Sequence, residues 1–236
     1  MKSEKRPVVL VTGAGRGIGR ATAEAFAAAG YAVVIAERVT RLGRSAVRAL
    51  RLNGAPAVFV RADVAAPRAA ERAVRAAVKH FGRLDCVVNN AGILTVARLD
   101  RLARRDLEAM VRVNLLGPLL IARAALPILR RRRRGAIVNV ASLLGKEGAG
   151  DYVTYCATKF GMIGFTEALA DELRGTGVRV WAVCPGQVDT AMARKAGVTE
   201  RDRSSMIAPA SVAHVIVALA TRRRHRPSGA SVDVTR

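Results

Sequence analysis

Tyr155 and Lys159 are the two residues whose types and spacing most directly suggest chemistry. Side chains four positions apart lie on one face of a helix, close enough to interact. A free phenol has a pKa of about 10, and a fixed ammonium group beside it favours the phenolate and moves that pKa towards the working range. Ser142, expected at the end of a strand, can donate a hydrogen bond to an oxygen held against the same phenol. This trio suits carbonyl–alcohol interconversion, whereas Tyr152 has Cys156, and no lysine, four positions further on.

The elements that must position these residues alternate between strand and helix along the chain. The expected strands cover residues 8–11, 32–36, 57–60, 84–88, 136–140 and 178–183, with a short one near Val232. The expected helices cover residues 20–29, 42–52, 67–81, 104–132, 155–174 and 211–220, and Gly117-Pro118 predicts an irregularity in the long one. This order predicts an α/β fold: a three-layer, Rossmann-type, doubly wound parallel sheet of about seven strands with helices on both faces. We expect residues 1–236 to form one domain, in which residues 187–209 act as a substrate lid.

The unusual residue clusters fall where these strands are expected to end. Glycines follow the first strand, and the later strands are followed in turn by Glu37-Arg38, Asp63-Val64, Asn89-Asn90-Ala91-Gly92, Ser142 and Pro185-Gly186. In doubly wound parallel sheets, ligands bind outside the carboxyl ends of the strands, near the point where the strand order reverses. We therefore expect a single site at this edge of the sheet.

The glycine-rich loop after the first strand predicts a dinucleotide site. It reads Thr12-Gly13-Ala14-Gly15-Arg16-Gly17-Ile18-Gly19 and does not fit the common G-x-G-x-x-G fingerprint. Its pattern is G-x-x-x-G-x-G, through Gly13, Gly17 and Gly19. The physical basis is the same, because the loop allows a tight turn, a close approach to a pyrophosphate and a helix N-terminus aimed at it. We expect Gly15, Arg16 and Ile18 to contribute to this site.

Glu37 and Arg38, at the end of the second expected strand, give conflicting signals about the cofactor. A carboxylate at this position can accept hydrogen bonds from ribose hydroxyls and would repel a 2′-phosphate, which favours NAD. Arg38, helped by Arg16, could instead attract that phosphate and favour NADP. We expect NAD or NADP, and favour NAD because a like charge facing the phosphate is costly.

Composition limits the class of protein. Hydrophobic residues make up 51% of the chain and charged residues 25%, which is typical of a globular protein. Three scattered cysteines (Cys86, Cys156, Cys184) and three histidines form no ligand pattern, so we expect reduced thiols in a cytoplasmic protein and no metal. No apolar h-region precedes the first strand, and no apolar run reaches the roughly 18 to 20 residues of a membrane span. We therefore expect neither a secretory signal nor a membrane segment.

The net charge of +22 comes mostly from arginine, with dense runs at residues 130–134 and 222–226. Such a field attracts polyanions by counterion release. Nucleic-acid recognition normally adds aromatic stacking, and aromatic residues are only 4% of this chain and do not interleave with the basic runs. We therefore expect a solvated arginine-rich surface and no specific nucleic acid. The alternative is a surface that steers an anionic substrate or an acidic carrier protein.

Taken together, the motifs resemble the short-chain dehydrogenase/reductase family in its short, single-domain form. The resemblance covers essentially the whole chain and rests on Thr12-Gly13-x-x-x-Gly17-x-Gly19, Asp63-Val64, Asn89-Asn90-Ala91-Gly92, Asn114, Ser142, Tyr155-x-x-x-Lys159 and Pro185-Gly186-x-Val188-x-Thr190. The chain departs from it at the C-terminus, where many relatives carry Asp-Gly-Gly and this sequence reads Val232-Asp233-Val234-Thr235-Arg236. The departure concerns the C-terminal packing and the oligomer interface rather than the chemistry.

The resemblance implies a role for each matching residue. Tyr155 would be the general acid/base, Lys159 would tune it and bind the nicotinamide ribose, and Ser142 would hold the substrate oxygen. Asn114 would anchor a water in a proton relay. The implied cofactor contacts are the adenine at Asp63 and Val64, the adjacent ribose at Asn90, Ala91 and Gly92, and the nicotinamide carboxamide at Val188 and Thr190, next to Pro185 and Gly186. The resemblance also implies a homotetramer or a dimer.

The loops after the fourth, fifth and sixth strands would line the substrate pocket with Leu94, Leu143, Leu144, Gln187 and Met192. These side chains are mostly apolar, so we expect an apolar ketone or secondary alcohol of modest size. The favoured function is a cytoplasmic oxidoreductase that moves a hydride between NAD(P) and a carbonyl or secondary alcohol carbon. One alternative is reduction of 3-oxoacyl groups on an acidic carrier protein. Another is a non-catalytic dinucleotide- or nucleic-acid-binding protein, which would have no need of a tuned phenol.

Overall fold

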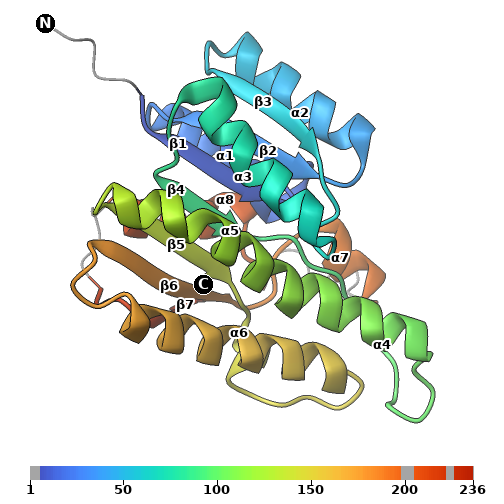
Figure 1. The fold of residues 1–236 in the computed structure, drawn as a ribbon. Coiled ribbons are helices and arrows are strands. Elements are labelled where there is room, and N and C mark those ends of the chain that lie inside the picture. Colours follow the sequence, from blue (N-terminus) through green and yellow to red (C-terminus); the bar gives the residue numbers. More distant parts are fainter. Residues whose placement is uncertain (1–5, 198–204, 222–225, 236) are drawn as a thin grey trace, which may run out of the picture.

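A computed structural model of the chain describes residues 6–197, 205–221 and 226–235. Seven parallel strands form one sheet in the order β3-β2-β1-β4-β5-β6-β7 (Figure 1). Their bounds are β1 Val8–Thr12, β2 Ala32–Glu37, β3 Ala57–Arg61, β4 Cys86–Asn89, β5 Gly135–Val140, β6 Val178–Pro185 and β7 Ser231–Val234. The order reverses between β1 and β4, so the predicted doubly wound parallel sheet is confirmed.

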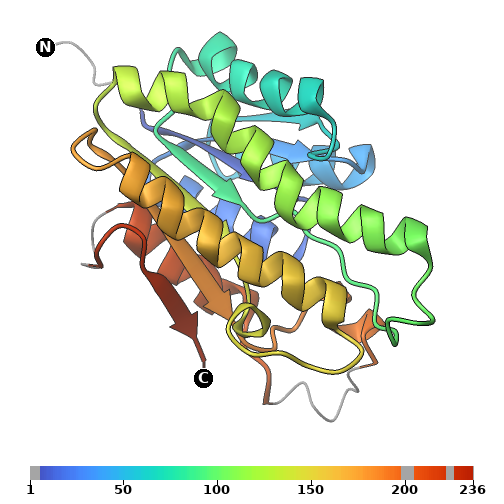
Figure 2. The ribbon, with the colours of Figure 1, turned by 60° about the horizontal axis from the view of Figure 1, so that its bottom comes forward.

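Helices cover both faces of the sheet and complete the three predicted layers (Figures 1 and 2). One face carries α1 (Gly17–Ala28), α2 (Thr40–Leu52) and α8 (Pro209–Ala220). The other carries α3 (Pro67–Phe81), α5 (Gly117–Arg131) and α6 (Val153–Glu172). The remaining elements are α4 (Arg104–Val111), the π-helical turn η1 (Arg112–Leu116) that joins it to α5, the 3₁₀ turn η2 (Leu143–Gly145) and α7 (Ala191–Lys195).

The alternation of side chains along each strand divides the core into two layers. In β1, Val9 and Val11 pack with α1, α2 and α8, whereas Val8 and Leu10 pack with α3, α5 and α6. All four side chains are fully buried. A strand covered on both faces is mostly apolar, which is why β1 and β2 read as nearly continuous apolar runs.

A chain of buried polar side chains fixes α6 against the sheet. Asn89 Nδ2 in β4 donates to Asn139 Oδ1 in β5 at 2.9 Å, and Asn139 Nδ2 donates to Thr166 Oγ1 in α6 at 2.8 Å. Thr166 donates in turn to the Met162 carbonyl at 2.7 Å. Breaking a bond in this chain would leave a buried polar group without its partner, so the chain ties β4, β5 and α6 together. Helix α6 carries the predicted catalytic pair.

The long helix is irregular close to the predicted position. The irregularity is η1, which ends directly before Gly117-Pro118 and contains Asn114. Pro118 has no N–H, so it cannot make the α-helical hydrogen bond to the carbonyl of Asn114 four residues earlier. The hydrogen-bond ladder is rearranged at this point, and π-helical turns of this kind are frequent at functional sites.

The stretch Arg104–Arg131, which joins α4, η1 and α5, is the one segment of the described chain long and apolar enough by composition to cross a membrane. Its apolar side chains Ile121, Ala125 and Leu129 are buried in the core beneath the sheet. Core helices pass the same test of composition, so this segment is weak evidence for a membrane span.

Some expected boundaries differ by a few residues from those in the structure. β4 begins at Cys86 rather than at residue 84, and α1 begins at Gly17 rather than at residue 20. The predicted lid contains α7 and an isolated bridge between Val188 and Ile207, and its residues 198–204 lie outside the described part of the chain. The arginine run at 222–226 also lies outside it, except for Arg226.

Candidate active site

A cleft of about 1070 Å³ lies at the carboxyl edge of the sheet. It brings together most of the predicted site residues, namely Gly13, Arg16, Gly17, Ile18, Glu37, Arg38, Asp63, Val64, Asn90, Ala91, Gly92, Leu94, Ser142, Leu143, Leu144, Tyr155, Lys159, Pro185, Gly186, Gln187, Val188, Thr190 and Met192. Gly15, Gly19 and Asn114 were also predicted, but they do not line the cleft. The loops after six different strands therefore converge on one site.

Tyr155, Ser142 and Lys159 meet at one end of this cleft. Ser142 follows β5 and caps η2, where its Oγ accepts a hydrogen bond from the Leu144 N–H at 3.2 Å. The Ser142 side chain also acts on Tyr155, in the first turn of α6, where it lowers the pKa of the phenol. Lys159 lies one turn further along α6, with Nζ 5.5 Å from the centre of the Tyr155 ring. That Nζ donates to the carbonyl of Val140, the last residue of β5, at 2.8 Å.

Burial disfavours the phenolate form of Tyr155 and the ammonium form of Lys159. Loss of hydration raises the pKa of Tyr155 to about 12, and the Ser142 side chain opposes that rise only in part. Burial likewise lowers the pKa of Lys159 to about 8. The sequence led us to expect a lowered tyrosine pKa, but in the protein alone burial outweighs any effect of the ammonium. The phenol, partly exposed towards the cleft, is therefore held in its protonated form.

Asn114 ties three elements together close to Tyr155. Its Oδ1 accepts from the Ile93 N–H at 2.8 Å, and its Nδ2 donates to the Ile93 carbonyl at 2.9 Å and to Thr158 Oγ1 at 3.3 Å. Thr158 donates to the Tyr155 carbonyl at 2.7 Å. The Asn114 side chain thus links η1, the loop after β4 and the first turns of α6, which makes it a positioning residue in this structure.

The glycine loop is held at the point where the strand order reverses. Thr12 Oγ1 accepts from the Asn90 and Ala91 N–H groups, each at 3.0 Å. Asn90 Nδ2 donates back to the carbonyls of Thr12 and Gly13 at 2.9 and 3.2 Å. Gly13 has φ of +63°, and a Cβ there would lie 2.8 Å from the Ala91 Cα. Only glycine fits this position, and the adjoining backbone stays open to a ligand.

Glu37, the last residue of β2, lies at the end of the cleft away from Tyr155. Its carboxylate is buried and accepts from the Gly15 N–H at 3.1 Å and from the Val39 N–H at 2.9 Å. A Cβ on Gly15 would lie 2.8 Å from Glu37 Oε2, so this glycine makes room for the carboxylate and does not reach the cleft itself. Arg16 and Arg38 line the same cleft. A fixed carboxylate beside an open glycine loop fits a ribose with free hydroxyls, so these residues suit a dinucleotide.

Among the lining side chains that were not predicted as part of the site, three are polar: Arg112, Glu147 and Tyr152. Tyr152 lacks a lysine four positions on, yet it precedes α6 and faces the same cleft as Tyr155. Glu147 follows η2, five positions after Ser142, and Arg112 opens η1, two positions before Asn114. All three lie within five positions of a residue that the sequence did predict, and this proximity could have identified them as candidates for the site.

Comparison with known proteins agrees with this geometry. The model of the family described as short chain dehydrogenase matches residues 7–201. The chain is 35% identical to a 3-oxoacyl-[acyl-carrier-protein] reductase of Thermotoga maritima, covering 96% of this chain and 95% of that protein. It is 40% identical to an L-fucose dehydrogenase of Oryctolagus cuniculus, covering 78% of this chain and 64% of that one. The solved structure of a levodione reductase superposes with a TM-score of 0.91 at 28% identity, covering 97% and 96% of the two chains.

Burial of Lys159 predicts a pH-dependent stability that Lys159→Met should remove. The lysine pKa falls from 10.5 to about 8 on folding, so below pH 8 the folded state bears the cost of a buried charge, and that cost fades as the pH rises towards 10.5. The wild type should therefore gain about 2 kcal/mol of unfolding free energy relative to Lys159→Met between pH 7 and 9.5. Urea unfolding at several pH values measures this. A constant difference between the two proteins would contradict the burial of a titrating ammonium.

Proposed function

The chain belongs to the short-chain dehydrogenase family, and from that premise we propose that it moves a hydride between NAD(P) and a carbonyl or secondary alcohol carbon, with Tyr155 as the general acid/base. One observation carries this proposal: Tyr155, Ser142 and Lys159 line the same cleft as the glycine loop and Glu37. A dinucleotide bound along that loop and a substrate at the phenol would share one cavity. The relatives named above are reductases and dehydrogenases, which favours this function over a nucleic-acid-binding protein.

In the proposed reaction the three catalytic side chains handle the substrate oxygen. The protonated phenol of Tyr155 would donate its proton to the alkoxide that develops when a ketone is reduced, and would accept it back when the alcohol is oxidised. Ser142 would donate a hydrogen bond to the same oxygen. Lys159 would stabilise the phenolate left behind, because its Nζ lies near the ring and is itself fixed by Val140. NAD(P) supplies or accepts the hydride when bound.

We infer a preference for NAD over NADP from the environment of Glu37. Two backbone N–H groups hold its carboxylate in place, and ribose hydroxyls could still donate to its remaining lone pairs. A 2′-phosphate would meet the same carboxylate at close range. Arg16 and Arg38 would attract the 2′-phosphate and so offset part of its repulsion by Glu37. The preference should therefore depend on the balance between one carboxylate and two guanidinium groups.

Three further features support finer proposals. The exposed apolar side chains Leu119 on α5 and Val153 and Phe160 on α6 support a homotetramer or dimer that would cover them. The three cysteines are buried and free, which supports a reducing cytoplasmic location. Because the sheet is continuous from β3 to β7, we propose that the whole chain is one domain, with residues 187–209 as the substrate lid.

Tyr155→Phe should abolish proton transfer without changing the fold or the cofactor site. We expect kcat to fall by about 10²–10⁴-fold while the Kd for NADH stays within about twofold. Stopped-flow turnover and fluorescence titration measure the two quantities. The matched control is Tyr152→Phe, which removes the other phenol of the cleft and should retain most of the activity. Equal losses in the two variants would show that Tyr155 is not the acid/base.

Glu37→Gln should reduce the discrimination between the two cofactors. The amide keeps an acceptor for a backbone N–H but removes the charge that opposes a 2′-phosphate, so the ratio of the NADPH Kd to the NADH Kd should fall about tenfold. Arg38→Ala should move that ratio in the opposite direction. Titration of each protein with both reduced cofactors tests this. If wild type binds NADPH more tightly than NADH, the proposed preference is wrong.

A second candidate, within the same chemistry, is reduction of 3-oxoacyl groups on an acidic carrier protein. The net charge of +22 and the relative of that name support it. For a carrier-bound substrate, kcat/KM should fall steeply between about 50 and 300 mM salt, because surface attraction is screened. The same acyl group on uncharged N-acetylcysteamine should show little dependence on salt. Similar salt dependence for both substrates would argue against docking of a carrier.

A further inference from the structure

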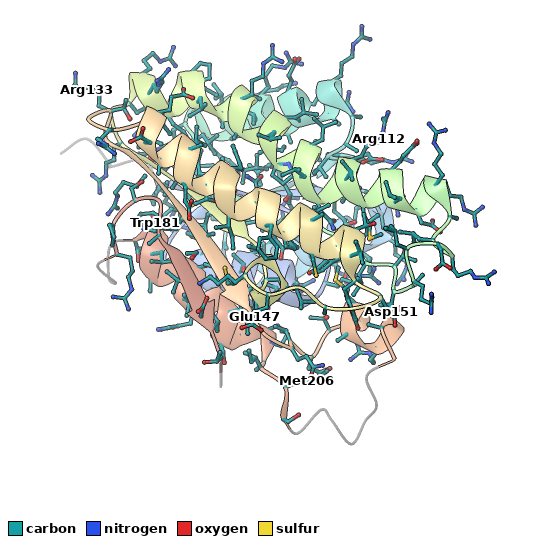
Figure 3. All side chains as sticks on the ribbon, turned by 90° about the horizontal axis from the view of Figure 1, so that it is seen from below. Arg112, Arg133, Glu147, Asp151, Trp181 and Met206 are labelled. Carbon is teal, nitrogen blue, oxygen red and sulfur yellow. The ribbon has the colours of Figure 1, made fainter. Side chains whose placement is uncertain are left out.

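Glu147 places a carboxylate in the catalytic part of the cleft. It follows η2 in the loop between Ser142 and α6, and it lines the cleft together with Ser142, Tyr152 and Tyr155. Its backbone N–H donates to the Leu143 carbonyl at 3.1 Å, which fixes the start of the loop. The other end of the loop is also held, because the Asp151 carbonyl accepts from the Ala97 N–H at 3.0 Å. Figure 3 shows Glu147 and Asp151 on this loop.

No cation in the described part of the chain pairs with this carboxylate. Lys146, its neighbour in sequence, is engaged by Asp233, with Nζ 2.6 Å from Oδ1. Lys159 is buried and donates to the Val140 carbonyl. Arg112, which also lines the cleft, lies on the long helix and is well separated from Glu147 in Figure 3.

The negative charge of Glu147 is opposite in sign to the net charge of the protein. With a net charge of +22, the surface field alone would favour anionic substrates. Arg16, Arg38 and Glu37 belong to the elements at the β1 and β2 end of the cleft, whereas Glu147 follows η2, five positions after Ser142. A substrate at Tyr155 would therefore meet an unneutralised carboxylate among otherwise mostly apolar side chains. Such a group attracts hydroxyl and ammonium groups and repels carboxylates.

We propose that Glu147 selects substrates by charge, so that the enzyme takes alcohols or ketones carrying a second hydroxyl or an ammonium group and disfavours free hydroxy or oxo acids. This inference rests on the oxidoreductase function proposed above. It changes the substrate class expected from the leucines alone, because one exposed carboxylate without a cationic partner adds a polar requirement to a mostly apolar pocket.

A set of three secondary alcohols with the same carbon skeleton tests the proposal: 4-amino-2-butanol, 1,3-butanediol and 3-hydroxybutyrate. Wild type should oxidise the amine and the diol with higher kcat/KM than the acid. In Glu147→Gln, the ratio of kcat/KM for the amine to that for the acid should fall by about tenfold or more, while the diol changes much less. Glu147→Asp should keep most of the wild-type ratio.

Two further variants separate a local effect from a change in total charge. Glu172→Gln removes the same charge from the exposed end of α6, where Glu172 pairs with Arg130, and should leave the ratio unchanged. Asp233→Asn frees Lys146 to pair with Glu147 and should lower the ratio with Glu147 still present. An unchanged ratio in Glu147→Gln, with activity retained, would overturn the inference and leave the oxidoreductase proposal intact. Oxidation of none of the three alcohols by wild type, with either cofactor, would overturn both.

Discussion

The functional edge of this protein depends on one hydrogen-bonded junction between β1 and β4. Thr12 Oγ1 accepts hydrogen bonds from the backbone N–H groups of Asn90 and Ala91, in the loop after β4. Asn90 Nδ2 donates in the other direction, to the carbonyls of Thr12 and Gly13 at the end of β1. The chain leaves β1 for one face of the sheet and β4 for the other, so the two loops diverge and leave space between them. Because Gly13 carries no side chain to fill that space, the junction holds the loops together while the cleft stays open.

The catalytic end of the cleft is built from groups whose charged forms are disfavoured. Burial raises the pKa of Tyr155, which keeps the phenol protonated, and lowers the pKa of Lys159 to about 8, which leaves its ammonium charged at neutral pH. A protonated phenol is the form that can give a proton to a developing alkoxide. Asn114 and Thr158 brace the first turns of α6, and the Asn89–Asn139–Thr166 chain braces its middle. These contacts keep the phenol in place without touching its hydroxyl, which leaves the hydroxyl free for Ser142 and a substrate.

Charge is distributed unevenly between the surface and the site. Most of the arginines lie on helix surfaces and loops, and among the described residues only Arg16, Arg38 and Arg112 line the cleft. The cleft itself carries acidic side chains from different elements, Glu37 beside the glycine loop and Glu147 after η2. The net charge of the chain is therefore a poor guide to what the site binds, because short-range contacts with these carboxylates act on a bound ligand more strongly than a screened distant field.

The sequence by itself determined the sheet, its layers, the cleft edge and most of the polar residues that line it. Apolar runs, glycines and Tyr155-x-x-x-Lys159 are local patterns, and parallel topology brings the ends of successive strands to one edge. Tertiary structure alone decided the burial and the bonding partners of the ionisable side chains. Whether a phenol is buried, which carbonyl receives Lys159, and whether Lys146 faces Glu147 or Asp233 depend on residues distant in sequence. Spacing along the chain cannot reveal these, because desolvation and ion pairing are set by what packs around a group in space.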